Sequence, residues 1–198
     1  MMTLGAGFLT VNPFKAEMRP PEPLELIEAR PAEPIDPSMR RLHNETYVAQ
    51  DVFENAKLWL ARCIYSETKR PDEQRLVAWV VRNRVETAFR GRTTYQRVVL
   101  DPYQFSAFNP GEYSRRHFMS LKPSYNERTW QQALNIAEEV LLADPLARPF
   151  ALNTRHFYSE RSMPSHMRHP RWAKNRVPVN LADFDIDERR FRFYSNIS

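Results

Sequence analysis

Glu67 is the residue of this sequence whose type and position most plainly suggest chemistry. It follows Leu60 by seven positions and Ile64 by three, so a helix through this segment places its carboxyl on the apolar stripe, at the C-terminal end. The negative end of the helix dipole and desolvation by apolar neighbours both raise a carboxyl pKa, as a general acid near neutral pH requires. The alternative is a helix that ends one turn earlier and leaves Glu67 solvated, and periodicity alone favours it.

Other kinds of catalytic centre find little support. The single cysteine, Cys63, lies in the apolar helical run, so no intrachain disulfide is possible and a buried thiol is expected. The five histidines include no pair at the spacing of a zinc hydrolase. We therefore expect neither a metal nor an organic cofactor.

Composition and charge narrow the class of partner. The 198 residues are 42% hydrophobic with a net charge of +5, which fits one folded domain that binds a polyanion: nucleic acid, anionic lipid or an envelope polymer. The basic residues are scattered and no nucleic-acid motif occurs, so nucleic acid is not expected. No segment approaches the length of a membrane span, so stable membrane insertion is not expected either. The N-terminus lacks the basic start of a signal peptide, and the localisation stays undecided.

The elements that must position Glu67 follow from periodicity. Residues 1–46 hold seven of the sixteen prolines and predict a Pro/Glu-rich extended segment, whereas residues 47–198 predict the catalytic domain. Helices are expected at about 51–67, from Pro71 through Val85, at 95–100 and at 127–143, the last capped by Asn126 or Ser124. Residues 151–179 read as irregular, and the alternation in 184–195 predicts a small hairpin. The fold class is therefore α+β and mostly helical, with a small C-terminal β element.

Four stretches occur in an order that resembles the SleB/CwlJ-type cell wall hydrolases, the spore cortex-lytic family that also occurs in phages. They are LARCIYSETKRPDEQRLVAWVVRNRV, YQRVVLDPYQFSAF, NTRHFYS and FRFYS, and together they cover about residues 52–194. The chain departs from the family pattern at Thr68-Lys69-Arg70, where the family has Ala-Arg-Gly, and at Arg155 before His156.

The resemblance implies a lysozyme-like, lytic-transglycosylase-type fold that binds peptidoglycan glycan strands and cuts between N-acetylmuramic acid and N-acetylglucosamine. It implies that Glu67 is the single catalytic acid. It also implies that Gln104, Phe105 and Ser106 line the cleft and face His156 and Tyr158. A monomer that acts on the cell wall, for example as a phage lysin, fits this picture.

Each supporting residue also has a simpler interpretation. Gln104 and Ser106 are common turn formers, and His156 and Tyr158 can be buried structural residues. Aromatic side chains near the cleft segment can stack on sugar rings or fill the core; they are Tyr103, Phe105, Phe108 and Tyr113. Asn83 lies beside the buried stripe of its helix and is expected to hold the helix pair together by hydrogen bonds.

The reaction stays open between three alternatives. Glycoside hydrolysis usually needs two carboxylates. The sequence does not clearly assign the second catalytic carboxylate to any of four candidates, Asp72, Glu73, Asp101 and Glu112. A lytic transglycosylase needs only one catalytic carboxylate and is therefore consistent with the lack of a second one. A muramidase-type hydrolase and a glycan-binding module without turnover are the alternatives.

Overall fold

A computed structural model describes residues 37–164, 166, 167 and 169–197 of the chain. Its helices are α1 (Pro37–Glu67), α2 (Pro71–Glu86), α3 (Tyr95–Val99), α4 (Arg115–Ser120) and α5 (Arg128–Leu142), and its strands are β1 (Thr154–Tyr158) and β2 (Arg192–Ser195). Short 3₁₀ turns lie in the connections between them. The predicted class, mostly helical with a small β element, is confirmed for these residues.

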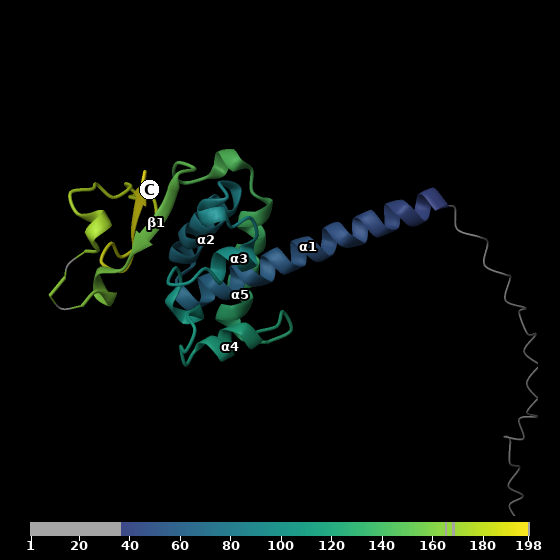
Figure 1. Cartoon of the computed structure of the whole chain (residues 1–198), viewed down its shortest axis with the longest axis horizontal. Helices are drawn as coiled ribbons and strands as arrows, with labels where there is room; N and C mark the ends of the chain where they lie inside the picture. The colour runs from purple at the N-terminus through teal and green to yellow at the C-terminus, as the bar shows by residue number, and fades with distance from the viewer. Residues whose placement is uncertain (1–36, 165, 168, 198) are drawn as a thin grey trace, which may run out of the picture.

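Helix α1 is the long axis of the molecule, and its N-terminal part projects away from the other helices (Figure 1). It begins at Pro37, so the predicted start near residue 51 was wrong, and so was the extended conformation predicted for residues 37–46. No proline or glycine interrupts the segment after Pro37, and proline itself suits the first turn of a helix. The rest of the predicted extended segment, residues 1–36, lies outside the described residues.

The core forms where α1, α2 and α5 pack together. Leu60 and Ile64 of α1, Leu76 and Val80 of α2 and Trp130 of α5 are all completely buried. These are the apolar stripes that the sequence predicts. They lock the C-terminal half of α1 against its neighbours and so fix where that helix ends.

The residue that caps the N-terminus of helix α5 differs from the two that the sequence predicts. The Glu127 carboxylate, not Asn126 or Ser124, accepts hydrogen bonds from the backbone N–H groups of Thr129 and Trp130. A carboxylate at this position satisfies free N–H groups and meets the positive end of the helix dipole. These hydrogen bonds lower the pKa of Glu127 to about 2.

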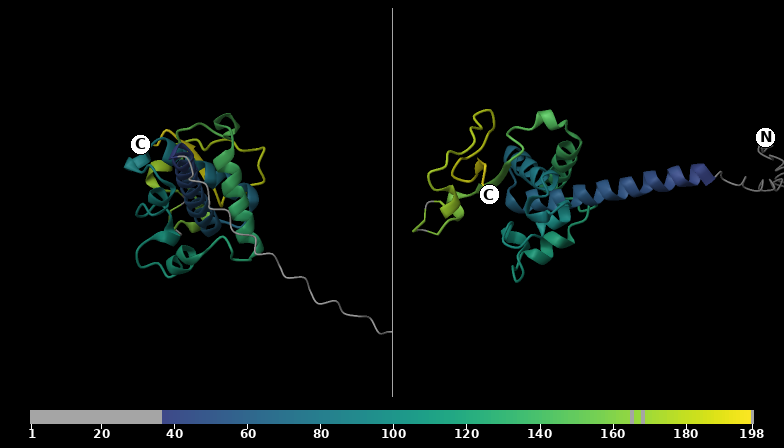
Figure 2. Two further views of the ribbon diagram at one scale, coloured as in Figure 1. Left: turned by 90° about the vertical axis from the view of Figure 1, so that its right-hand side faces the viewer. Right: turned by 45° about the horizontal axis from the view of Figure 1, so that its top comes forward.

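The sheet joins two segments far apart in the sequence. Strand β1 pairs antiparallel with β2, in a register that places His156 opposite Tyr194 and Phe157 opposite Phe193. The predicted hairpin within 184–195 was therefore wrong, and so was the irregular conformation predicted for 154–158. Both strands lie at one end of the molecule, beside the C-terminus and away from the projecting part of α1 (Figures 1 and 2). Phe193 is 1% exposed and ties the sheet to the helical core.

No helix in the described part of the chain is both long and apolar enough to cross a membrane.

Candidate active site

A cleft of about 520 Å³ opens between the C-terminal end of α1, the loop after α3 and the sheet. Its lining comprises Glu67, Tyr103, Gln104, Ser106, Asn109, Phe157, Tyr158, Ser159, Arg161, Ser162, Met163, Arg190 and Phe191. Four separate segments contribute to this lining, and Glu67 is the residue that α1 supplies. The predicted acid therefore lies in a cavity large enough to hold part of a polymer.

Glu67 is the last residue of α1, so the alternative that periodicity alone favours, a helix that ends one turn earlier, was wrong. Its side chain is half-buried and opens to the cleft. Burial raises the pKa of Glu67 to about 7, and the nearby Arg84 guanidinium opposes this rise. Near neutral pH the carboxyl thus populates both the protonated and the ionised form, which suits a group that first donates and later accepts a proton.

Arg84 supplies a buried positive charge behind the acid. It is 4% exposed on α2, and its Nε donates a hydrogen bond of 2.8 Å to the carbonyl of Arg155. Its guanidinium carbon lies 5.5 Å from the ring centre of Phe89 and 5.1 Å from that of Phe105. Its Nη1 is buried and has no hydrogen-bond partner among the described residues. Burial lowers the pKa of Arg84 to about 10, so it remains charged when Glu67 titrates.

Asn83, the neighbour of Arg84, holds the sheet in place. It is completely buried, and its Nδ2 donates hydrogen bonds to the carbonyls of Thr154 at 2.9 Å and Ala151 at 3.2 Å. The predicted hydrogen-bonding role is thus observed, but the partner is the start of β1, not another helix. Asn83 and Arg84 together attach β1 to α2 and so position one wall of the cleft.

The structure brings together only some of the predicted site residues. Gln104, Ser106 and Tyr158 line the cleft with Glu67. Phe105 does not, since its side chain is 1% exposed and packs in the core. Turning Phe105 inward is what leaves its neighbours Gln104 and Ser106 facing outward, so the expectation that all three line the cleft was wrong for Phe105.

His156 also lies outside the cleft lining. Its ring packs 5.3 Å from the centre of Phe89 and 5.4 Å from that of Trp172, on the side of β1 opposite to Phe157. Burial, together with Arg84 and Arg155, lowers the pKa of His156 to about 4, so the ring is neutral near pH 7. The structure therefore does not place His156 where it was expected, in the cleft lining. Its ring packs against aromatic side chains instead.

The aromatic side chains near the cleft divide in the same way. Tyr103 is 84% exposed and lines the cleft, whereas Phe108 is buried. Tyr113 is almost fully exposed but lines a separate surface hollow near α4. Only Tyr103 of this group is placed to stack on a sugar in the cleft.

The other carboxylates weighed as a second catalytic group all lie elsewhere. Asp101 is buried and paired with Arg90 at 2.6 Å and with Arg92 at 3.0 Å. Glu112 lines the hollow near α4. Asp72 forms an ion pair of 3.1 Å with Arg75.

Glu73 differs from the helix-start charge that the sequence suggested. It is completely buried, accepts a hydrogen bond of 2.5 Å from Thr68, and pairs with Arg190. Among the residues that the structure describes, Glu67 is thus the one carboxylate that lines the cleft.

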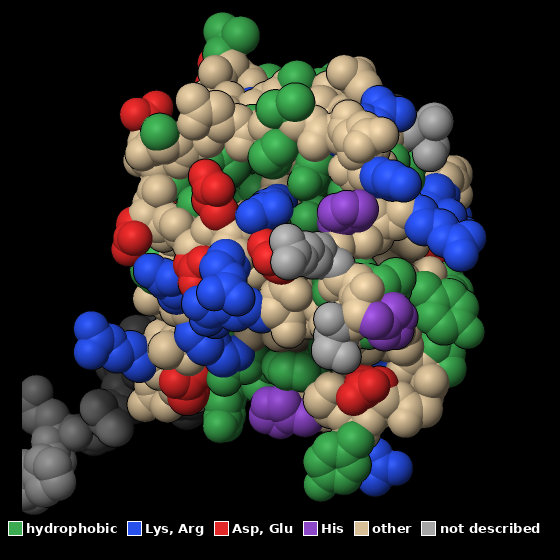
Figure 3. All heavy atoms as spheres, turned by 90° about the vertical axis from the view of Figure 1, so that its left-hand side faces the viewer, with side chains coloured by type: hydrophobic (Ala, Val, Ile, Leu, Met, Phe, Trp, Pro, Cys, Tyr) green, Lys and Arg blue, Asp and Glu red, His purple; other side chains and the backbone are tan. Residues whose placement is uncertain are grey.

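Several residues that line the cleft were not predicted from the sequence. Phe157 and Phe191 supply apolar walls, and Arg161 and Arg190 supply positive charge. Figure 3, which views the end of the molecule that carries the sheet, shows Lys and Arg side chains gathered next to acidic ones. The sequence gives no local signal for these four, because they come together only when the segments on either side of the sheet fold back over α2.

Within the described ranges, no group of three or more His, Cys, Asp or Glu side chains is arranged to hold a metal ion.

Comparison with known proteins gives one match. The family model described as Cell Wall Hydrolase matches residues 69–185, which is more than half of the chain. The matched region contains Gln104, Ser106, Tyr158 and Arg161, and it begins two residues after Glu67. No curated protein and no solved structure matches the chain significantly.

Proposed function

The chain belongs to the cell wall hydrolase family, and on this premise we propose that it cuts the glycan strand of peptidoglycan with Glu67 as its single acid and base. The scissile bond in this proposal joins N-acetylmuramic acid to N-acetylglucosamine. The observation that carries the proposal is that the Glu67 carboxyl lines a cleft at the end of α1, where burial raises its pKa to about 7. Such a pKa keeps a useful fraction of the acid protonated at neutral pH.

The proposed reaction has two proton transfers. Protonated Glu67 gives its proton to the glycosidic oxygen, and the bond from that oxygen to the muramoyl C1 breaks, leaving an oxocarbenium-like centre. The Glu67 carboxylate then removes a proton from the muramoyl C6 hydroxyl, whose oxygen bonds to C1 and closes a 1,6-anhydro ring. If water attacks C1 instead, the same carboxylate accepts the proton of that water and the product has a reducing end.

One feature of the cleft favours the transglycosylase form of this reaction. Glu67 has no second carboxylate beside it among the described cleft residues, so no obvious group holds or activates water. Arg84 provides a fixed positive charge that stabilises the carboxylate after the first proton transfer, and it does so in both forms of the reaction. In a muramidase-type hydrolase a water molecule takes the place of the C6 hydroxyl as nucleophile. Analysis of the products distinguishes the two reactions.

The rest of the cleft suits a glycan. Gln104 and Ser106 offer amide and hydroxyl groups for hydrogen bonds with N-acetyl and hydroxyl substituents, and the exposed Tyr103 ring offers a flat face for a sugar. We also propose a SleB/CwlJ-type member with a lysozyme-like arrangement. In support, the acid ends a long helix and a small antiparallel sheet lines the other side of its cleft.

The experiment is release of soluble muropeptides from purified sacculi. We expect the protein to release them and Glu67→Gln to abolish the release, whereas Glu112→Gln, a matched change outside the cleft, leaves the rate unchanged. Mass spectrometry of the products distinguishes a 1,6-anhydro end from a reducing end. Activity that survives in Glu67→Gln contradicts the assigned acid. Binding to sacculi without any release by the unaltered protein supports a glycan-binding module instead.

A further inference from the structure

Two arginines, each paired with a carboxylate, line the cleft beside Glu67. Arg161, which follows β1, and Arg190, which precedes β2, both line the cleft with Glu67. Their acidic partners, Asp187 and Glu73, are not part of the described lining. Arg84 and burial already account for the pKa of Glu67, so these two cations are not needed to tune the acid.

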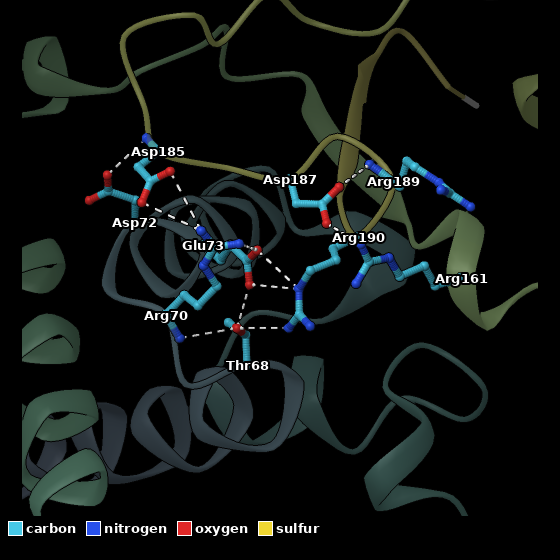
Figure 4. Close-up of polar contacts among 9 residues, drawn as sticks. All are labelled: Thr68, Arg70, Asp72, Glu73, Arg161, Asp185, Asp187, Arg189 and Arg190. Atoms are coloured by element: carbon cyan, nitrogen blue, oxygen red, sulfur yellow. Dashed lines mark hydrogen bonds and ion pairs between the residues drawn. The ribbon is translucent and has the colours of Figure 1, made fainter.

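A buried network holds Arg190 in place (Figure 4). Its Nε lies 3.1 and 3.4 Å from the two carboxylate oxygens of Glu73, and its Nη2 lies 3.4 Å from the hydroxyl oxygen of Thr68. Glu73 and Thr68 are both buried and are hydrogen-bonded to each other. A guanidinium anchored along one edge loses little conformational freedom when its remaining N–H groups bind a ligand.

The outer edge of the Arg190 guanidinium remains open. Within the part of the chain that the structure describes, Nη1 has no hydrogen-bond partner, and the side chain is 34% exposed. Since the residue lines the cleft, this free edge is accessible to a substrate. A planar edge of this kind matches the two oxygens of a carboxylate.

Arg161 is held on the same side of the cleft by Asp187. Its Nη2 lies 2.5 Å from Oδ2 of Asp187, whose Oδ1 accepts a hydrogen bond of 2.9 Å from the backbone N–H of Arg189. The backbone of Arg161 also donates to the carbonyl of Arg189 at 3.2 Å. These contacts tie Arg161 to the segment that carries Arg190, although its side chain is still 52% exposed.

We propose that Arg161 and Arg190 form a subsite that binds a carboxylate of the glycan substrate. This inference rests on the proposed function, because it assigns part of the same cleft. Peptidoglycan offers carboxylates from two sources: its stem peptides, and the lactyl group of muramic acid where the peptide has been removed. N-acetylglucosamine polymers offer neither, so the subsite selects muramic-acid strands over chitin-like ones.

The test measures binding without cleavage, in the Glu67→Gln background, with three soluble glycans. They are peptidoglycan strands with stem peptides, the same strands stripped of peptides by an amidase, and N-acetylglucosamine oligomers. We expect Arg161→Gln to weaken binding of the carboxylate-bearing strand about tenfold, the loss of one charge-assisted hydrogen bond, and to leave the oligomers unaffected. The matched control is Arg189→Gln, an exposed arginine of the same segment that does not line the cleft.

The test of Arg190 needs a paired variant, because removing Arg190 alone leaves the buried Glu73 carboxylate with only Arg70, 3.5 Å away, as its cationic partner. The comparison is therefore between Glu73→Gln and Glu73→Gln/Arg190→Gln, with folding checked by thermal unfolding. Weakening on peptide-bearing strands alone assigns the stem peptide, and weakening on stripped strands alone assigns the lactyl group.

Unchanged binding of both strands in Arg161→Gln overturns the proposal, and so does equal weakening on the N-acetylglucosamine oligomers. Neither result depends on turnover, so failure of Glu67 as the catalytic acid is detected separately, by muropeptide release.

Discussion

Removing the Glu67 carboxyl should stabilise the protein, and the gain should depend on pH. Burial raises the folded-state pKa from an ordinary value of 4.5 to about 7. Below pH 4.5 the folded and unfolded chains both carry the proton, so the shift costs nothing. As the pH rises from 4.5 to 7, the unfolded chain releases the proton first, and the free energy of unfolding falls; above pH 7 the loss is constant.

The size of the effect follows from the shift. A difference of about 2.5 pKa units corresponds to about 3.5 kcal/mol, since each unit is worth about 1.4 kcal/mol, and this is an upper bound because the carboxyl faces the water of the cleft. The glutamine amide introduced by Glu67→Gln does not titrate, so this variant avoids the loss. For a domain of this size we expect a Tm increase at pH 8.5 of at most roughly 7–14 °C, and little change at pH 4.5.

Thermal unfolding of both proteins at the two pH values, followed by circular dichroism, measures this difference. Glu112→Gln, which changes a carboxyl outside the cleft, should show the same Tm difference from the unaltered protein at both pH values. If the Tm difference between Glu67→Gln and the unaltered protein is the same at pH 4.5 and 8.5, the carboxyl is not buried as described. That result would refute the burial of Glu67 as the cause of its raised pKa, whereas the catalytic role of Glu67 is tested independently by muropeptide release.

Three further outcomes test other parts of the structure. Arg84→Met removes the cation that lowers the pKa of Glu67, so the alkaline fall in kcat/KM should move to higher pH; an unmoved limb in the pH profile of muropeptide release argues against this coupling. Asn83→Ala leaves the Ala151 and Thr154 carbonyls without their donor and should lower the free energy of unfolding by about 2 kcal/mol in urea titrations, whereas a loss near zero contradicts its role in holding β1. Cys63 is completely buried and its thiol pKa is raised by burial, so a thiol reagent should label it only after unfolding, and rapid native labelling refutes the packing of α1.

The helical part of the fold was predictable because its signals are local. A stripe with a period of 3.6 residues shows where α1 is buried, and it places Glu67 at the end of that stripe without reference to any other segment. Pro71 likewise marks the start of α2. The raised pKa of Glu67 is the expected consequence once the helix reaches this residue, but the burial that causes it comes from packing against other segments.

The turn between α1 and α2 contains residues whose burial could not be predicted from neighbouring sequence. Thr68 and Arg70 look like a basic loop in the sequence, yet Thr68 is buried against Glu73, and Arg70 lies 3.5 Å from Glu73 and 3.4 Å from Asp185. Glu73 has the position of an ordinary helix-start charge, but Arg190, more than a hundred residues later, decides that it is buried. A burial that depends on so distant a partner leaves no pattern near the residue itself.

Sequence alone determined the apolar stripe of α1 and the position of Glu67 on it, because both depend on neighbours within two helical turns; only the packed structure decided that the helix continues to Glu67 and that its carboxyl lines the cleft. Tertiary structure alone decided that β1 pairs with β2, that Phe105 and His156 turn away from the cleft, and that Arg161 and Arg190 enter it. Strands of four or five residues carry too little alternation to specify a partner, and the side of a sheet that faces a cleft is fixed only when the sheet docks on the helices.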